Sequence, residues 1–188
     1  MISYEIIEGC KSGDRKCQNS LVQEAAPRLL AVCRRYCSDH EKAKDALQET
    51  FINTFRYLHT YNGSGSFEGW MKRIAVTCSI AVQKKSGPLY FSDQEISDDS
   101  NQASLPDVYS DLGVEEIMKL LDKLPKSLNI VFNMYVIEGY SHKEIGEILN
   151  INESTSRANL TKARARMIEL IKAECAGSGV LKHVAAFF

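Results

Sequence analysis

The sequence predicts an all-α protein: two small helical domains joined by a flexible acidic linker, with a helix-turn-helix in the second domain. Apolar residues recur at helical spacing on both sides of residues 87–112, and no segment alternates as a strand would. The stretch Tyr140–Met167 also carries two helix patterns around a three-residue turn. The predicted segments are a domain at 1–86, a linker at 87–112, a domain at 113–175 and a tail at 176–188.

The first segment, from Met1 to about Ser38, is expected to be helical with two disturbances. Its apolar residues recur at helical spacing from Leu21 to Tyr36. Gly9–Gly13 is expected to interrupt the helix near its start. Pro27 lacks an amide proton, so a kink or a break is expected there.

The next helix is predicted from Asp39 to Leu58. Its inward stripe is expected to be Ala43, Ala46, Leu47, Phe51, Phe55 and Leu58. Its outer face is expected to hold Asp45, Gln48, Glu49, Ile52 and Arg56. An exposed isoleucine among acidic and amide side chains is typical of a protein-binding surface, although a merely solvated face can have the same composition.

Residues 60–66, TYNGSGS, are predicted to form a loop because they combine Asn-Gly, a second glycine and small hydroxyls. Aromatic residues flank this loop. The helix expected from Phe67 to about Lys85 has a basic outer set, which is Lys72, Arg73, Lys84 and Lys85. Because aromatic rings stack on bases and lysines follow phosphates, the region could hold an unstacked base. The alternative is an aromatic cluster that only anchors the core.

The net charge of −1 hides an uneven distribution. Residues 1–86 hold 13 basic and 9 acidic side chains, and residues 113–188 hold 10 and 9. Residues 87–112 hold six acidic and no basic side chains, together with two prolines, which predicts a self-repelling, flexible linker. Mildly basic flanks around an acidic connector remain compatible with nucleic-acid binding.

The second domain begins with two expected helices, one over Val114–Leu121 and one starting at Pro125. The helix-turn-helix follows. Ser141 and Glu144 form a capping-box pattern, and Asn150–Asn152 supplies the turn. One stripe of the second helix is expected to pack inward: Ser156, Leu160, Ala163, Met167, Leu170 and Ile171. The opposite side carries Ser154, Arg157, Ala158, Thr161 and Lys162. This basic and polar face favours contact with a DNA major groove over a pair of helices that only packs.

Several other functions find no support in the sequence. Cys33, Cys37 and His40 offer three metal ligands without a fourth, so we expect buried thiols and no metal site. No phosphate loop or nucleophile motif is present, and Asp45 with Glu49 has no histidine partner, so no catalytic residue, enzyme activity or cofactor is expected. No apolar run is long enough to span a bilayer and no signal peptide begins the chain, which predicts a cytoplasmic protein without membrane insertion.

Four motifs together resemble bacterial sigma factors of the extracytoplasmic-function (ECF) type. They are DALQETF at 45–51, SFEGWMKRIA at 66–75, LDKLP at 121–125 and YSHKEIGEILNINESTSRANLTKAR at 140–164. The resemblance covers about residues 5–85 and 113–172. It implies an all-α factor that binds core RNA polymerase and directs promoter-specific transcription initiation by reading the −10 and −35 DNA elements.

The resemblance also implies roles for individual residues. Asp45, Gln48 and Glu49 fall where the family docks on the clamp of the largest polymerase subunit. The loop that captures a flipped −10 base corresponds to residues 61–66, including Tyr61, Asn62, Gly63 and Ser64. Lys72, Arg73, Lys84 and Lys85 fall on the helix that meets the −10 DNA. The −35 recognition surface corresponds to Ser154, Arg157, Ala158, Thr161 and Lys162.

The chain departs from the family pattern at several of these positions. Thr77 and Ala81 replace an Asn and an Asp, which puts −10 contacts there in doubt. Ser156 stands where a valine usually packs, and Asn159 and Lys162 stand where arginine is common. Arginine reads guanine bidentately and lysine does so less selectively, so Arg157 is expected to carry more of the −35 discrimination than its neighbours.

The resemblance implies three partners: core RNA polymerase, promoter DNA and an anti-sigma factor. Two alternatives remain open at this stage. One is a free-standing helix-turn-helix transcriptional regulator, which would bind duplex DNA without polymerase. The other is a degenerate sigma-like interaction module, which would bind polymerase or a regulator without selecting promoters.

Overall fold

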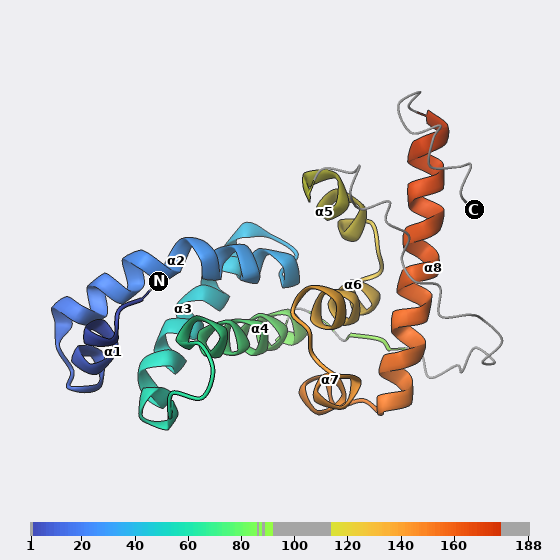
Figure 1. Ribbon diagram of the computed structural model, residues 1–188. Helices are drawn as coiled ribbons and strands as arrows, with labels where there is room; N and C mark the ends of the chain where they lie inside the picture. Colours follow the sequence, from blue (N-terminus) through green and yellow to red (C-terminus); the bar gives the residue numbers. More distant parts are fainter. Residues whose placement is uncertain (1, 86, 88, 92–113, 178–188) are drawn as a thin grey trace. The chain divides into compact units, whose positions relative to one another are not determined.

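The computed structural model describes residues 2–85, 87, 89–91 and 114–177, and this part of the chain is mostly helical with no strand (Figure 1). The chain divides into two compact units, residues 1–88 and 89–188. Most of the predicted linker and tail, residues 92–112 and 178–188, lies outside the described residues. None of the described helices has the length and apolar character needed to cross a membrane.

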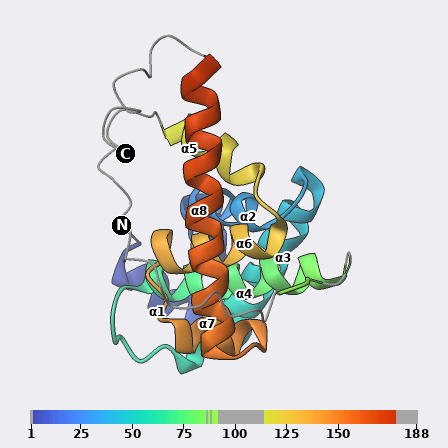
Figure 2. The same cartoon turned by 90° about the vertical axis from the view of Figure 1, so that its right-hand side faces the viewer.

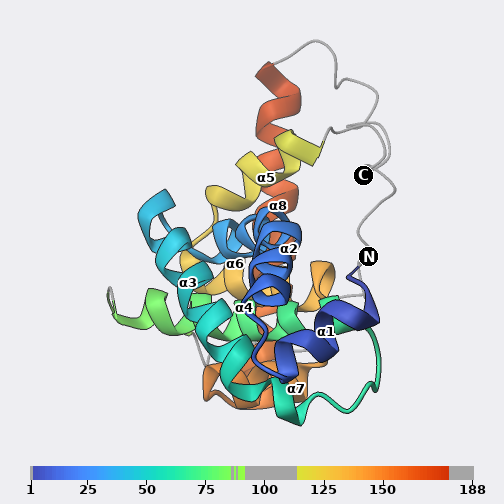
Figure 3. The same ribbon diagram turned by 90° about the vertical axis from the view of Figure 1, so that its left-hand side faces the viewer.

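The described part of the N-terminal unit contains four α-helices and one 3₁₀ turn. They are α1 (Tyr4–Lys11), α2 (Arg15–Tyr36), α3 (His40–Tyr57), η1 (Leu58–Thr60) and α4 (Phe67–Lys85). Helices α2, α3 and α4 pack pairwise around one core, and α1 packs on α2 and touches η1 (Figure 3). Large side chains from all three core helices are buried, including Leu21, Tyr36, Phe51, Met71 and Ile80.

Side chains at the helix starts explain where these helices begin. Ser3, Asp14 and Asp39 accept hydrogen bonds from the backbone N–H groups of Ile6, Lys16 and Lys42. Such caps satisfy donors that have no partner inside the first turn. The predicted helix from Asp39 to Leu58 is confirmed. Ala43, Ala46 and Phe51 are buried, and all five residues assigned to its outer face are exposed.

The interruption expected at Gly9–Gly13 is confirmed, because α1 ends at Lys11 and α2 begins at Arg15. The alternative of a break at Pro27 is wrong. Helix α2 runs through Pro27 without a break. Its burial of Leu21, Ala25 and Leu29 against the core offsets the hydrogen bond that proline cannot make. Gly9 lies inside α1, and a Cβ there would approach the Cys17 sulfur to 2.2 Å, so this glycine permits close helix packing. The chain turns at Gly13, whose φ is +82°.

The C-terminal unit is built around its longest helix. Its described elements are α5 (Val114–Asp122), α6 (Lys126–Phe132), a π-helical turn η3 (Asn133–Ile137), α7 (His142–Leu149) and α8 (Glu153–Gly177). Helix α8 packs against α5, α6 and α7, and runs as a long rod beside them (Figure 2). The core includes Leu121, Ile130, Phe132, Ile145 and Met167.

A buried pair of amides holds the first part of this unit. The Asn129 amide donates to the Leu121 carbonyl at 2.6 Å, which ties the end of α5 to α6. The Asn133 amide donates to the Asn129 side-chain oxygen at 2.8 Å. Both side chains are almost fully buried. Because an unpaired buried amide is costly, these bonds fix the spacing of α5 and α6 beside the π-helical turn.

Candidate nucleic-acid interface

The outer face of α3 presents acidic and amide side chains beside one apolar residue. Asp45, Gln48 and Glu49 are exposed, and Ile52 is 42% exposed one turn further along. The opposite side of α3 is buried against α2 and α4, so the core packing fixes the direction of this face. An exposed isoleucine within reach of two carboxylates suits a partner that offers both basic and apolar groups.

The loop between η1 and α4 is held by its own hydrogen bonds. The Tyr61 hydroxyl donates to the Gly65 carbonyl at 2.9 Å, and the Ser64 N–H donates to the Asn62 side-chain oxygen at 2.9 Å. Gly63 and Gly65 have φ values of +81° and +77°, which favour glycine. The loop is therefore a preformed turn, and Asn62 both shapes it and lies exposed on it.

Three aromatic rings support this loop. The centroid of the Tyr61 ring lies 5.0 Å from that of Phe67 and 5.6 Å from that of Trp70. Phe67 is buried, whereas Tyr61 and Trp70 are half-buried. Phe67 therefore anchors the loop in the core, as the alternative interpretation of the aromatic cluster predicts. Tyr61 joins the loop to the core and retains exposed ring surface that could stack on a base.

A cavity of about 620 Å³ lies between this loop and α1. Its walls come from two segments, α1 with the residue before its cap and the loop with the start of α4. The lining residues are Ile2, Tyr4, Ile7, Glu8, Lys11, Tyr61, Asn62, Gly63, Ser66, Phe67 and Glu68. The contribution of α1 could not be predicted, because nothing in its amphipathic pattern indicates which loop it faces.

The basic residues of α4 form two separate groups. Lys72 and Arg73 lie in its first half, and Lys84 and Lys85 end the helix. All four are exposed. Ten residues of helix lie between the groups, and the twelve steps from Lys72 to Lys84 span about 18 Å, so the groups suit phosphates several nucleotides apart. Thr77 lies between them, exposed, and its hydroxyl donates to the Arg73 carbonyl at 3.0 Å.

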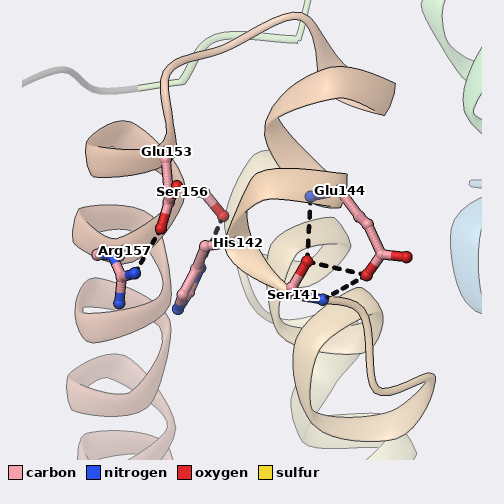
Figure 4. A network of polar contacts seen from close by, with 6 residues as sticks. All are labelled: Ser141, His142, Glu144, Glu153, Ser156 and Arg157. Atoms are coloured by element: carbon pink, nitrogen blue, oxygen red, sulfur yellow. Dashed lines mark hydrogen bonds and ion pairs between the residues drawn. The ribbon is translucent and has the colours of Figure 1, made fainter.

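The helix-turn-helix is fixed at both ends of α7 (Figure 4). Ser141 and Glu144 form the predicted capping box. The Ser141 hydroxyl accepts from the Glu144 N–H at 3.2 Å, and the Glu144 carboxylate accepts from the Ser141 N–H at 2.9 Å. Asn150 ends α7 in the left-handed conformation, with φ of 59°. This turn directs the chain into α8 three residues later.

A buried histidine joins α7 to α8, a contact that the sequence pattern did not indicate. His142 Nδ1 lies 2.9 Å from the Ser156 hydroxyl (Figure 4). The imidazole also stacks on Tyr135, with ring centroids 4.4 Å apart. Ser156 is fully buried, so this hydrogen bond explains a serine on the inward stripe. The sequence offered one indication of this hydrogen bond, which is that Ser156 is a polar residue on the inward stripe of α8.

The environment of His142 favours the neutral imidazole. Burial lowers the pKa of His142 below its ordinary value of 6.5, and the positive charges of Arg157 and Arg164 lower that pKa further. Glu153 acts in the opposite direction. The Arg164 guanidinium also lies 5.9 Å from the Tyr135 ring centroid, on the ring that stacks on His142.

The predicted recognition surface lies on the first turns of α8. Ser154, Arg157 and Thr161 are exposed, and Ala158 and Lys162 are half-buried. Arg157 forms an ion pair with Glu153 one turn earlier (Figure 4). Asn159 is only 1% exposed, and its amide donates to the Thr155 carbonyl at 2.7 Å. Asn159 therefore packs inside the unit and does not replace an arginine on the outer surface.

Comparison with known families assigns both units. Residues 21–81 match the family model for sigma-70 region 2, and residues 114–167 match the model for sigma-70 region 4. Together the two matches span more than half of the chain. The chain belongs to the sigma-70 family. Helix α1 lies before the region 2 match, and the whole predicted −35 surface lies within the region 4 match.

Curated relatives place this sigma factor in the ECF type. It is 29% identical over 156 residues to the ECF sigma factor SigE of Mycolicibacterium smegmatis, covering 79% of this chain and 59% of that relative's length. It is 25% identical over 175 residues to the ECF sigma-E factor of Haemophilus influenzae, covering 87% and 92% of the two chains. SigW of Bacillus subtilis is also 25% identical, with 87% and 94% covered.

Solved structures agree on the fold of this sigma factor. CnrH, solved in complex with the cytosolic domain of CnrY, matches with a TM-score of 0.52 at 17% identity, covering 92% of this chain and 99% of CnrH. The sigma factor RpoE, solved with the anti-sigma factor NepR from Bartonella quintana, matches with a TM-score of 0.53 at 17% identity, covering 82% and 96%.

The environment of His142 predicts a pH dependence of stability in this sigma factor. Because the pKa of His142 is lower in the folded state, the unfolded state binds more protons between that pKa and 6.5. The contribution of neutral His142 to the stability of the C-terminal unit should therefore be fully present above pH 6.5 and be lost as the pH falls through the folded-state pKa. Hydrogen exchange of α7 and α8 amides between pH 5 and pH 8 measures this change.

His142→Gln should flatten this dependence, and His59→Gln, which removes an exposed imidazole from the other unit, is the matched control. Intrinsic exchange rates must be divided out at each pH. If the opening free energy of α7 and α8 varied with pH equally in the wild type and in His142→Gln, the histidine would not be the cause.

Proposed function

We propose that this sigma factor binds core RNA polymerase and directs transcription initiation at promoters with two DNA elements. The observation that carries the proposal is the presence of both region 2 and region 4 on one chain, each on its own compact unit. A free-standing regulator needs only the helix-turn-helix, so the region 2 match removes its main support. The factor acts in the cytoplasm by binding alone, without a catalytic step of its own.

Polymerase docking is assigned to the outer face of α3. Asp45, Gln48 and Glu49 are the residues for which we propose contact with the polymerase clamp, with Ile52 supplying apolar contact among them. The exposure of all four residues on one face supports this assignment. Complementary charge would speed association, and the apolar contact would contribute to affinity.

Reading of the −10 element is assigned to the loop and to α4. The Tyr61–Ser66 loop would take one unstacked base, and Lys72, Arg73, Lys84 and Lys85 would contact phosphates. A preformed loop lowers the entropy lost when the base is bound. This binding would offset the unstacking of the base, which costs a few kcal/mol.

Reading of the −35 element is assigned to the exposed start of α8. The first turns of α8 would act as the recognition helix in the major groove. The residues that would face the bases are Ser154, Arg157, Ala158, Thr161 and Lys162. An anti-sigma factor is the proposed regulator. Both solved neighbours come from complexes, one of them of a sigma factor with an anti-sigma factor.

Charge reversal on α3 tests polymerase docking. Asp45→Lys and Glu49→Lys should each weaken binding to core RNA polymerase by roughly tenfold or more, because each replaces an attraction with a repulsion. Fluorescence anisotropy of the labelled full chain measures the affinity. Glu24→Lys reverses an exposed carboxylate on α2 and is the matched control. Equal affinity of all three variants would contradict the docking assignment.

Arg157 tests the −35 assignment. Arg157→Ala should reduce the difference in binding free energy between matched and mismatched −35 duplexes by about 1–3 kcal/mol, because a bidentate contact to a base is lost. The affinity ratio should therefore fall by roughly fivefold or more. Arg166→Ala removes an exposed arginine that pairs with Glu169 further along α8, and should leave the ratio unchanged. An unchanged ratio in Arg157→Ala, measured at a fixed salt concentration, would assign the discrimination elsewhere.

A further inference from the structure

The cavity beside the Tyr61–Ser66 loop has a wall that the region 2 match does not include. Helix α1 and Ile2 supply five of its lining residues, and α1 ends ten residues before the match begins. Helix α1 is held in place by packing on α2, where Gly9 meets Cys17 closely, and by contact with η1. The wall is therefore part of the folded unit.

The two walls of the cavity differ in chemistry. The loop side offers the rings of Tyr61 and Phe67, and α1 offers the Tyr4 ring, which is 75% exposed. The charged groups come mainly from α1, where Lys11 Nζ lies 2.9 Å from the Glu8 carboxylate. The third charged residue, Glu68, is already paired with Arg28 at 2.7 Å. The Glu8 carboxylate can only accept hydrogen bonds and the Lys11 ammonium can only donate them, so a hydrogen-bond acceptor lies beside a donor.

This combination matches an unstacked nucleobase. A base needs a flat apolar surface for its faces and hydrogen-bonding groups for its edge, and every Watson–Crick edge carries a donor next to an acceptor. The cavity volume of about 620 Å³ is in the range of sites for small organic ligands.

We propose that Glu8 and Lys11 of α1 bind the Watson–Crick edge of the base that the Tyr61–Ser66 loop takes up, and so determine which base is preferred. This inference rests on the proposed reading of the −10 element and adds a specificity-determining pair outside the region 2 match. Before the base arrives the two side chains pair with each other. With the base present, the carboxylate accepts from its donor and the ammonium donates to its acceptor.

Cross-linking identifies the base concerned. Promoter DNA carrying 4-thiothymine at each −10 position in turn is bound by the full chain with core RNA polymerase and irradiated. One position should cross-link to peptides of α1 or of residues 61–67. Cross-links confined to α4 and α8 at every position would overturn the proposal.

Base preference is then measured at that position. Initiation rates are compared on promoters carrying each of the four bases there, for the wild type, Lys11→Met and Glu8→Gln. The ratio between the best and the worst base should fall by at least about fivefold in both variants, the lower end of what one contact to a base edge gives. Because the readout is a ratio, changes in polymerase affinity cancel.

The matched controls are Lys44→Met and Glu41→Gln on α3. These two residues form an ion pair at 3.0 Å with the same three-residue spacing, and neither lines the cavity. Both should keep the wild-type ratio. A wild-type ratio retained by Lys11→Met and Glu8→Gln, or the same loss in the controls, would overturn the proposal.

Failure of the proposed function would be seen separately, as a wild-type chain that does not initiate with core polymerase. In that case a single-stranded oligonucleotide carrying 4-thiothymine, cross-linked to the full chain alone, still tests the cavity. Adducts on α1 or on residues 61–67 would support a base-binding site in the cavity, and adducts confined to other segments would contradict it.

Discussion

Mutual burial of amphipathic helices decides which side chains this sigma factor can present to its partners. In the N-terminal unit, Tyr36, Phe51 and Met71 meet in one core, and their burial turns the acidic face of α3 and the basic residues of α4 outward. Each buried side chain of this size contributes about 1.5–3 kcal/mol, far more than any exposed ion pair on the same helices. The binding faces are therefore set by the apolar stripes behind them.

The C-terminal unit follows the same logic with one polar exception. The turn at Asn150 and the capping box at Ser141 fix the direction of α7, while Leu160, Ala163 and Met167 hold α8 against the unit's core. His142 and Ser156 place a hydrogen bond inside that contact. Because burial and the charge of Arg157 lower the pKa of His142, we predict that protonation of this imidazole destabilises the contact between α7 and the start of α8, which presents Arg157.

Most of the fold could be predicted from the sequence because helices and caps are local. The helix over Phe67–Lys85, the capping box and the left-handed turn all follow from neighbouring residues. Features that depend on contacts between distant segments were not predicted. Burial of α2 against the core keeps the helix continuous through Pro27, and Gly9 permits close packing on Cys17. Asn159 is buried inside the C-terminal unit. The cavity wall formed by α1 belongs to the same class. The residues assigned to polymerase and DNA stay predictions, because their positions are compatible with those roles without testing them.

The most direct test of promoter selection is transcription by core RNA polymerase, with and without this chain, on a promoter library randomised at both elements. We predict discrete start sites that appear only with the chain and share a two-part motif at fixed spacing, since two units of one protein must bind together. Initiation without a shared motif would contradict promoter selection. Absence of both initiation and binding to core polymerase would contradict the assignment as an initiation factor.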